Sequence, residues 1–441
     1  METIYALSSA GGRAGVAVIR VSGPKVIFIL EMMSGIERPE ARRARLCRLR
    51  DPETGVELDQ ALVLFFAGPH SFTGEDVVEF HVHGGRAVIA GVLATLSRFD
   101  GVRAAEPGEF TRRAFENGKL ELTAVEGLAD LIDAETEGQR RQALRQMEGA
   151  LGKIYDGWRG RLIKLLAHAE AEIDFADEDL PDGLLERAGQ ELGVLAHEIQ
   201  NHLDDGHRGE RLRDGVEVAI VGPPNVGKSS LLNRLAGREA AIVSDEAGTT
   251  RDVLEVRLDL AGVPVTLADT AGLRQGQGAV EKEGIRRGLA RASSADLRLV
   301  MVAPDAQGRL EGDFELARSG DLKILNKSDR GIDGPLDEGL ILISALSGEG
   351  IDELIAALTA KVGTLFGASE NPVITRARHR EGLADCAEAL ARAEHGLKAG
   401  LDPALVAEDL RIAMRALGRI TGRVDVEDLL DVVFRDFCIG K

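Results

Sequence analysis

The spacing of hydrophobic positions changes character along the first half of the chain. Residues 1–118 hold short β-like apolar runs, such as residues 16–21 and 61–66, separated by Gly and Pro. This punctuation is typical of an α+β domain. Between residues 119 and 212, leucines and isoleucines recur within charged surroundings as on helical faces. This second stretch is therefore predicted to form long helices.

The second half of the chain changes again. Residues 213–368 repeat an order of strand, Gly-rich turn and helix, which favours a mostly parallel sheet covered by helices. Residues 369–441 return to a helical pattern. Two helical stretches around an α/β segment indicate one helical domain into which the α/β domain is inserted, a topology that works where the inserted termini lie close together. The predicted fold class is multidomain, α/β plus α.

Composition and charge narrow the function classes. With 44% hydrophobic and 29% charged residues, the chain has the composition of a soluble globular protein. Its net charge of −19 repels polyanions on average, so a nucleic acid must meet a local basic patch. Arg411, Arg415, Arg419 and Arg423 recur every four residues and would form one basic stripe on a helix. A stripe neutralised by neighbouring acids is the alternative.

Cysteine usage and hydropathy predict the compartment. Cys47, Cys386 and Cys438 are too few and too widely spaced for a disulfide framework or a zinc site, which favours a reducing environment. The apolar runs fall short of the roughly 18 residues that span a bilayer. The N-terminus lacks the pattern of a secretory signal. We expect a cytoplasmic protein with no membrane contact.

A phosphate-binding loop follows the apolar run 216–221. Residues 222–229 match G-x-x-x-x-G-K-[ST] between a predicted strand and a helix, the context that this motif requires. Backbone N–H groups of such a loop cradle phosphates, Lys228 spans the β and γ oxygens, and the Ser229 hydroxyl ligates Mg²⁺. The loop residues assigned to the nucleotide are Asn225, Val226, Gly227, Lys228, Ser229 and Ser230.

Three further motifs follow strands in the order of a GTPase. They are Asp269, Thr270, Ala271 and Gly272; Asn326, Lys327, Ser328 and Asp329; and Ser344, Ala345 and Leu346. An Asp after N-K-x accepts hydrogen bonds from guanine N1 and N2, which adenine cannot donate. These motifs predict GTP as the substrate and disfavour an ATP-dependent motor.

The loop between the phosphate motif and Asp269 is the candidate switch. It contains Ser244, Asp245, Glu246, Ala247, Gly248, Thr249 and Thr250. Thr250 is placed to become a second Mg²⁺ ligand when γ-phosphate is present, although a capping role is the alternative. Alternation in residues 255–260 and a turn at Ala261 and Gly262 predict a hairpin that leads to Asp269.

The water-orienting residue of hydrolysis is not at its usual place. Leu273 follows Gly272, where Ras-like GTPases have Gln. Acidic and amide candidates downstream are Gln275, Glu281 and Glu283.

These motifs, with residues 12–20, 71–76, 83–85, 107–111 and the terminal 438–441, resemble the MnmE (TrmE) family of tRNA-modification GTPases over the whole chain. The resemblance implies a homodimer with a folate-binding N-terminal domain, a helical domain and an inserted Ras-like P-loop GTPase domain. It also implies K⁺ in place of an arginine finger, held by Asn225, Ser244, Glu246 and Thr249, with Glu281 orienting the attacking water. Ser244 stands where Thr is more usual.

The resemblance further assigns a tetrahydrofolate derivative, in its 5-formyl or methylene form, to Arg20, Glu79, Lys119 and Lys441. A cross-strand ion pair is the alternative for Arg20 and Glu79. The implied reaction adds a carboxymethylaminomethyl group to C5 of a wobble uridine in certain tRNAs.

Flavin chemistry must come from a partner, because the chain has no dinucleotide-binding G-x-G-x-x-G after a strand. The family's flavin-dependent MnmG (GidA) would supply it in a heterotetramer or larger assembly. Cys438 in the terminal Cys-x-Gly-Lys is assigned a catalytic or site-completing role, with tail packing as the alternative. A ribosome-assembly or signalling GTPase of the Era or Der type remains the alternative function.

Overall fold

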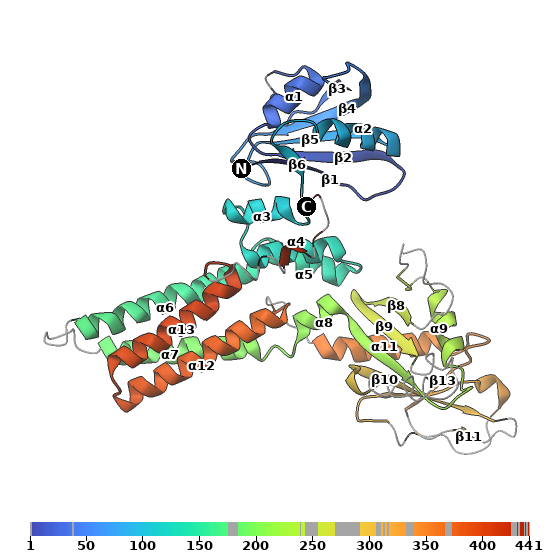
Figure 1. Cartoon of the computed structure of the whole chain (residues 1–441). Helices are drawn as coiled ribbons and strands as arrows, with labels where there is room; N and C mark the ends of the chain where they lie inside the picture. The colour runs from blue at the N-terminus through green and yellow to red at the C-terminus, as the bar shows by residue number, and fades with distance from the viewer. Residues whose placement is uncertain are drawn as a thin grey trace, which may run out of the picture. The chain divides into compact units, whose positions relative to one another are not determined.

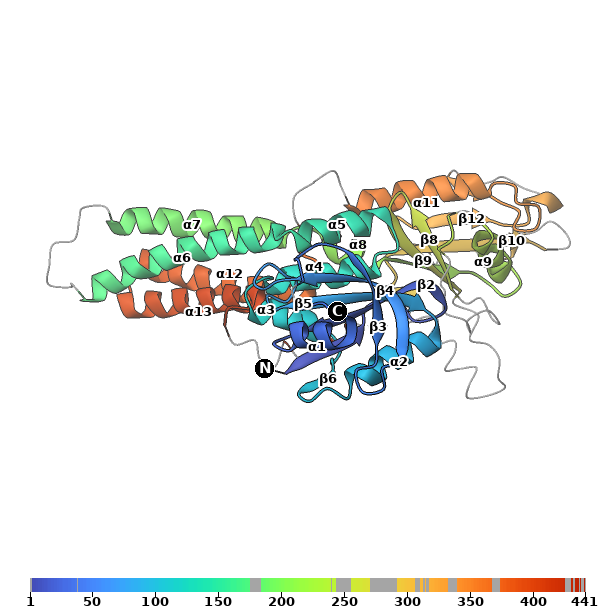
Figure 2. The same cartoon turned by 90° about the horizontal axis from the view of Figure 1, so that it is seen from above.

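The computed structural model describes residues 2–37, 39–174, 184–238, 240–242, 255–269, 292–305, 310–311, 314, 317–331, 339–366, 373–424, 430, 433–435, 437 and 440. They form two compact units (Figures 1 and 2). The first comprises Met1–Ala129, Met147–Arg161 and Met414–Lys441, and the second comprises Asp130–Gln146 and Leu162–Ala413.

A six-stranded sheet forms the centre of the first unit. Its strand order is β3-β4-β5-β2-β1-β6, antiparallel except for the pair β1 and β6. Helices α1 and α2 pack on one face, where strand residues such as Ile19 and Phe80 are fully buried. The bounds are β1 (Thr3–Leu7), β2 (Ala14–Ser22), α1 (Val26–Ser34), β3 (Arg45–Arg50), β4 (Glu57–Phe66), β5 (Val77–Gly84), α2 (Arg86–Leu96), β6 (Val102–Ala104) and α3 (Glu109–Glu116).

Side chains alternate between the two faces of this sheet, which decides where Arg20 and Glu79 lie. Because their neighbours Ile19 and Phe80 face α1 and α2, Arg20 and Glu79 point to the opposite face. Ile4, Ala6 and Phe110 of α3 form a smaller apolar cluster on that side. The face of the sheet opposite α1 and α2 therefore carries the polar pair.

A second sheet forms the centre of the α/β part of the second unit. Its order is β13-β12-β10-β7-β9-β8, parallel except for the pair β8 and β9, and β11 pairs with β10. Apolar residues of α9 and α11 pack against it (Figure 2). The bounds are β7 (Val216–Val221), α9 (Lys228–Ala236), β8 (Glu255–Leu260), β9 (Val263–Asp269), β10 (Leu297–Pro304), β11 (Leu310–Glu311), β12 (Leu322–Leu325), the 3₁₀ turn η1 (Ser328–Arg330), β13 (Leu340–Leu342) and α11 (Ile351–Phe366).

The remaining elements are helices that precede or follow the strands of this sheet in the sequence. They are α4 (Leu122–Asp133), α5 (Glu137–Met147), α6 (Ala150–Asp174), α7 (Leu184–Leu203), α8 (Arg208–Asp214), α12 (Ala377–Ala399) and α13 (Pro403–Thr421). Helices α7 and α12 lie side by side (Figure 1), where Gly189 lies against Leu397.

The two ends of the α/β segment meet, as the insertion requires. Ile374 N–H donates to Asp205 at 3.1 Å, and Arg380 pairs with Asp205 at 2.7 Å and with Glu210 at 3.0 Å. The predicted fold class is therefore confirmed, including the mostly parallel sheet and the hairpin before Asp269. The domain limits at 118, 212 and 368 stay predictions.

Candidate functional site

The phosphate loop and the predicted base motif lie at the carboxyl edge of the parallel strands. Asn225 follows β7, Asp269 ends β9, Asn326 follows β12, and Ser344 follows β13. Since β9 and β10 lie on opposite sides of β7, this edge includes the point where the strand order reverses. Ligands of open α/β sheets bind at such a point.

Asn326 connects these two motifs. Its amide Nδ2 donates to Val226 O at 2.8 Å, and its Oδ1 accepts from Ala345 N–H at 2.9 Å. Gly227 has a φ of +102°, and a Cβ there would lie 2.2 Å from Asn326 Nδ2. The glycine of the phosphate loop is thus required by the close approach of the base motif.

Lys228 and Ser229 begin α9 and point toward groups of the nucleotide site. Lys228 Nζ donates to Gly222 O and Pro223 O, each at 2.9 Å, and the residue is buried. The Ser229 hydroxyl donates to Asp269 Oδ2 at 2.9 Å. A hydroxyl and a carboxylate held this closely at a helix N-terminus are the ligand types of a phosphate-bound Mg²⁺.

The base motif leaves its acidic residue accessible. Lys327 Nζ donates to Asn225 O at 2.8 Å, whereas Asp329 lies in η1 and is exposed. Ser344 is fully buried, and Leu346 is 82% exposed. Ser230 lies within α9, and Ser328 begins η1.

Many switch and catalytic predictions fall outside the described residues. These are Ser244, Asp245, Glu246, Ala247, Gly248, Thr249, Thr250, Thr270, Ala271, Gly272, Gln275, Glu281, Glu283, Cys438 and Lys441. Their assignments stay predictions.

Arg20 and Glu79 form the centre of the predicted folate site. They are direct cross-strand partners on β2 and β5, and Arg20 Nη2 lies 2.9 Å from Glu79 Oε1. The other carboxylate oxygen lies 3.3 Å from His81 Nε2. The ion pair expected as the alternative is therefore present, and both groups remain partly exposed.

Two aromatic rings flank the Arg20 guanidinium. Its carbon lies 5.5 Å from the ring centre of Phe72 and 5.7 Å from that of Phe110. Lys119 Nζ donates to Pro69 O at 2.9 Å, in the same β4–β5 connection that carries Phe72. The structure thus brings Lys119 to the segment that contacts Arg20.

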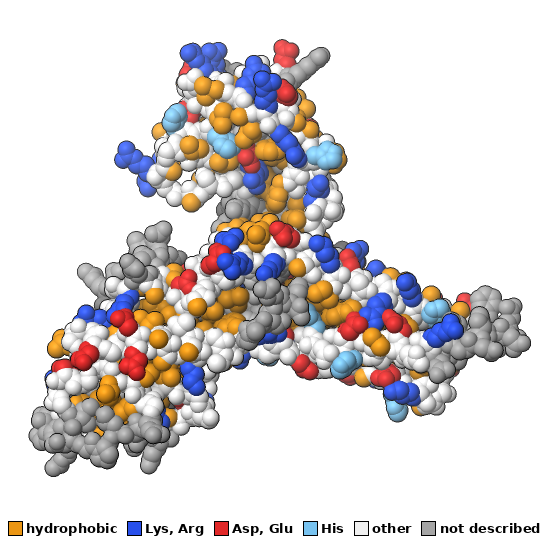
Figure 3. Space-filling model, turned by 180° about the vertical axis from the view of Figure 1, so that it is seen from behind, with side chains coloured by type: hydrophobic (Ala, Val, Ile, Leu, Met, Phe, Trp, Pro, Cys, Tyr) orange, Lys and Arg blue, Asp and Glu red, His pale blue; other side chains and the backbone are white. Residues whose placement is uncertain are grey.

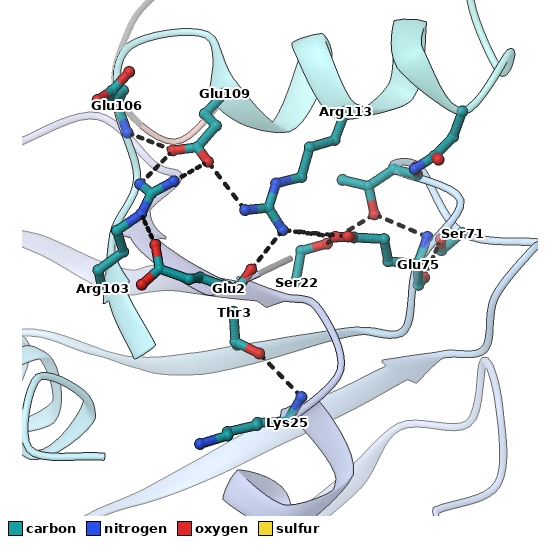
Figure 4. Close-up of polar contacts among 12 residues, drawn as sticks. Glu2, Thr3, Ser22, Lys25, Ser71, Glu75, Arg103, Glu106, Glu109 and Arg113 are labelled. Atoms are coloured by element: carbon teal, nitrogen blue, oxygen red, sulfur yellow. Dashed lines mark hydrogen bonds and ion pairs between the residues drawn. The ribbon is translucent and has the colours of Figure 1, made fainter. Parts of the chain in front are cut away.

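An ion network joins the two segments that carry Phe72 and Phe110, namely the β4–β5 connection and α3 (Figure 4). Arg113 of α3 lies 3.0 Å from Glu109 and 3.0 Å from Glu75, and Arg103 lies 2.7 Å from Glu109. Burial works to raise the pKa of Glu109, but hydrogen bonds from Arg103, Glu106 N–H and Arg113 outweigh it and lower that pKa. Sequence reasoning gave these residues no role, although the runs 71–76 and 107–111 contain Glu75 and Glu109.

The C-terminal tail reaches the same sheet. The Ser8 hydroxyl donates to Gly440 O at 2.8 Å. Gly440 has a φ of +101°, and a Cβ there would lie 2.3 Å from Leu7 O. Since Leu7 is the register partner of Ile19, next to Arg20, the tail docks on the strand pair that carries Arg20.

The predicted arginine stripe is ion-paired. Arg411 bonds Glu170 at 3.0 Å, and Arg423 bonds Asp156 at 2.8 Å. Arg415 and Arg419 also have partners. Helix α13 ends at Thr421, so the expectation that one helix carries the stripe to Arg423 was wrong, because Gly422 has a φ of +83° and breaks the helix.

The two other cysteines are packed in the fold. Cys386 is buried in α12, where burial raises its pKa to about 12, and burial also raises the pKa of the half-buried Cys47. Within the described ranges, no helix combines the length and apolarity that crossing a bilayer requires.

Comparison with known proteins identifies the family. A family model described as the MnmE helical domain matches residues 122–438, and one described as the GTP-binding protein TrmE N-terminus matches residues 3–119. The "tRNA modification GTPase MnmE" of Parvibaculum lavamentivorans is 69% identical over all of both chains, and that of Paramagnetospirillum magneticum is 54% identical over all of both. A human protein, "5-taurinomethyluridine-[tRNA] synthase subunit GTPB3, mitochondrial", is 51% identical over 100% of this chain and 93% of its own. The chain belongs to the MnmE (TrmE) family of tRNA-modification GTPases.

Proposed function

We propose that this chain is a potassium-dependent GTPase that, with a flavoprotein partner, adds a carboxymethylaminomethyl group to C5 of a wobble uridine in tRNA. The added carbon would come from methylene-tetrahydrofolate. The observation that carries the proposal is the docking of Gly440 at the end of β1, the strand that pairs with the β2 strand holding Arg20. Gly440 belongs to the terminal Cys-x-Gly-Lys, so its position supports a role for this motif near the polar pair assigned to folate.

The nucleotide part rests on the edge of the second sheet. Backbone N–H groups at the start of α9 face the position of phosphates, and Lys228 lies beside them. Ser229 and Asp269 fit Mg²⁺ because both offer oxygen ligands and lie within 2.9 Å of each other. Mg²⁺ there would neutralise charge that develops on the phosphates.

Potassium dependence rests on Asn225. Its φ of +63° turns the backbone at the centre of the loop, and Lys327 holds its carbonyl oxygen. With Ser244, Glu246 and Thr249 as further ligands, a fixed monovalent cation would stabilise transition-state charge as an arginine does.

The folate part rests on complementary charge. The glutamate carboxylates of a tetrahydrofolate fit Arg20 and Lys119, and the amino-pyrimidine edge of the pterin fits a carboxylate such as Glu79. Phe72 and Phe110 border Arg20 and offer apolar faces to the pterin ring. Lys441 would complete the site from the tail.

Assembly and location complete the proposal. The exposed α1 side chains Ile27, Phe28 and Met32 form an apolar surface that supports the homodimer. MnmG would supply flavin chemistry in a heterotetramer or larger assembly. We propose a cytoplasmic location.

Titration of 5-formyl-tetrahydrofolate into the full-length protein tests this function. We expect Arg20→Gln to weaken binding by more than about tenfold, the loss of one charged hydrogen-bond partner. Arg98→Gln is the matched control, because Arg98 pairs with Asp51 elsewhere in the same unit. Equal binding by wild type and Arg20→Gln would remove folate from this site.

Hydrolysis is tested separately with Glu281→Ala. A residue that orients water acts chiefly in the transition state, so GTP binding should persist while turnover falls. Survival of turnover would transfer the role to Gln275 or Glu283.

A further inference from the structure

The edge strand β3 and the segment before it carry a concentration of arginines. Arg42, Arg43, Arg45, Arg48 and Arg50 lie within nine residues, with no acidic residue among residues 41–50. All five are exposed. Lys and Arg side chains gather at this end of the N-terminal sheet, at the top of Figure 3. In a chain of net charge −19, this is a local reversal of sign.

Neighbouring acids neutralise the arginines incompletely. Arg43 pairs with Glu40 at 2.6 Å, and Arg48 lies 3.6 Å from Glu57. Arg45 and Arg50 have no ion pair among the residues that the structure describes. Exposed pairs are worth less than about 1 kcal/mol, so a stronger anion can replace those partners.

Other exposed arginines of the chain contrast with this group. Arg140 and Arg141 of α5 both pair with Glu137 at 2.7 Å and lower the pKa of that carboxyl to about 2. The ion-paired Arg411 and Arg423 also differ from Arg45 and Arg50. Close carboxylates thus neutralise these four arginines, whereas none is paired with Arg45 or Arg50 among the described residues.

The geometry of an edge strand suits a nucleic-acid backbone. Arg48 and Arg50 alternate with the buried Leu49 and point to one side about 7 Å apart along the strand, of the order of the separation of neighbouring phosphates, while Arg45 points to the other side of the same edge. The guanidinium fork binds phosphate oxygens in a bidentate manner. Because β3 pairs only with β4 in this sheet, backbone N–H groups on its other side also remain as donors.

The position of β3 in the sheet also fits the binding of an RNA near Arg20. In the sheet order, β3 is separated from β2 and its Arg20 by β4 and β5, roughly 14 Å at the spacing of strands. Leu46, Leu62 and His81 are register partners on the face that carries Arg20 and Glu79. An RNA held at the edge would thus have one continuous sheet face between it and the polar pair.

We propose that the arginine edge, residues 42–50, binds the phosphate backbone of the tRNA substrate. The proposal rests on tRNA being the substrate, as in the proposed function. Arginines that merely prevent pairing with a second sheet edge are the alternative, and that role needs no nucleic acid.

The test measures binding of labelled total tRNA to the full-length protein by fluorescence anisotropy over a series of salt concentrations. For Arg45→Gln/Arg50→Gln we expect about threefold to tenfold weaker binding at low salt. The slope of log affinity on log salt should fall in magnitude by about 1.5, because each lost phosphate contact removes about 0.7–0.9. Arg140→Gln/Arg141→Gln changes the net charge equally and should bind within about twofold of wild type.

Two further measurements keep the result interpretable. Arg45→Lys/Arg50→Lys should retain most of the salt slope, because the charges persist. GTP hydrolysis and thermal unfolding should be unchanged in the β3 variants, since β3 lies in the other unit from the nucleotide site.

Three results would overturn the proposal. They are unchanged tRNA binding by Arg45→Gln/Arg50→Gln, equal loss in both glutamine variants, and absence of tRNA binding by wild type with and without its flavoprotein partner. Folate binding and uridine modification in cells are separate measurements, so failure here is distinguishable from failure of the proposed function.

Discussion

Asn326 and Val226, 100 residues apart in the sequence, are joined by a hydrogen bond of 2.8 Å from a buried side-chain amide to a backbone carbonyl. The bond fixes the phosphate loop to the segment predicted to recognise the base. We therefore expect Asn326 to affect phosphate and base binding together, because its amide oxygen also accepts from Ala345 N–H.

Asn326→Ala should weaken binding of GTP and GDP alike by about tenfold or more. The variant leaves buried backbone groups without partners, at a cost of about 1–3 kcal/mol. Nucleotide titration checks this. Asn233→Ala in α9 is the control, and a selective loss for only one nucleotide would contradict the structural role of Asn326.

Asp329→Asn should shift preference from GTP toward xanthosine triphosphate. Its exposed carboxylate is available to two N–H donors of guanine, and each charge-assisted bond is worth about 1.5–3 kcal/mol. Competition between the two nucleotides measures the shift. If GTP affinity is unchanged in this variant, the base assignment fails.

Potassium should accelerate GTP hydrolysis by more than about tenfold over sodium at matched ionic strength, as a replacement for an arginine finger. Asn225→Ala should lose this acceleration and keep nucleotide. Equal turnover in the two salts would contradict a role of K⁺ in GTP hydrolysis.

Glu109→Gln should destabilise the first unit by about 2 kcal/mol at neutral pH, since it removes the shared partner of Arg103 and Arg113. The pKa of Glu109 is lowered by folding, so this stability is present above its unfolded pKa of about 4.3 and is lost as pH falls through the folded value. The difference between variant and wild type should therefore shrink in acid.

Urea unfolding followed by fluorescence of Trp158, the single tryptophan of the chain, reports on this unit. The exposed pair partner Glu40 provides the control, and Glu40→Gln should change stability by less than about 0.5 kcal/mol. A difference for Glu109→Gln that persists below its folded pKa would contradict the linkage.

Local patterns predicted the elements of the second sheet well, because each motif there combines a strand, a tight turn and a helix start. The hairpin at Ala261 and Gly262 and the strand before Gly222 were readable for this reason. The resemblance to a family added Arg20 and Glu79, which spacing alone left as an ion pair. Contacts between distant segments were not predictable, since neither the approach of Gly227 to Asn326 nor that of Gly440 to Leu7 leaves a periodic signal.

The stripe of Arg411, Arg415, Arg419 and Arg423 shows how a regular sequence pattern can mislead. A regular spacing of four suggested one functional surface, but Glu170 and Asp156 come from another helix and neutralise its ends. Sequence period describes one helix and says nothing of the charges that pack beside it.

Nucleoside analysis of total tRNA from a strain that lacks this gene tests the central claim most directly. We predict that 5-carboxymethylaminomethyluridine is lost, that the wild-type gene restores it, and that Cys438→Ser fails to restore it while retaining potassium-stimulated GTP hydrolysis. Unchanged amounts of the modified uridine in the strain without the gene would contradict the account.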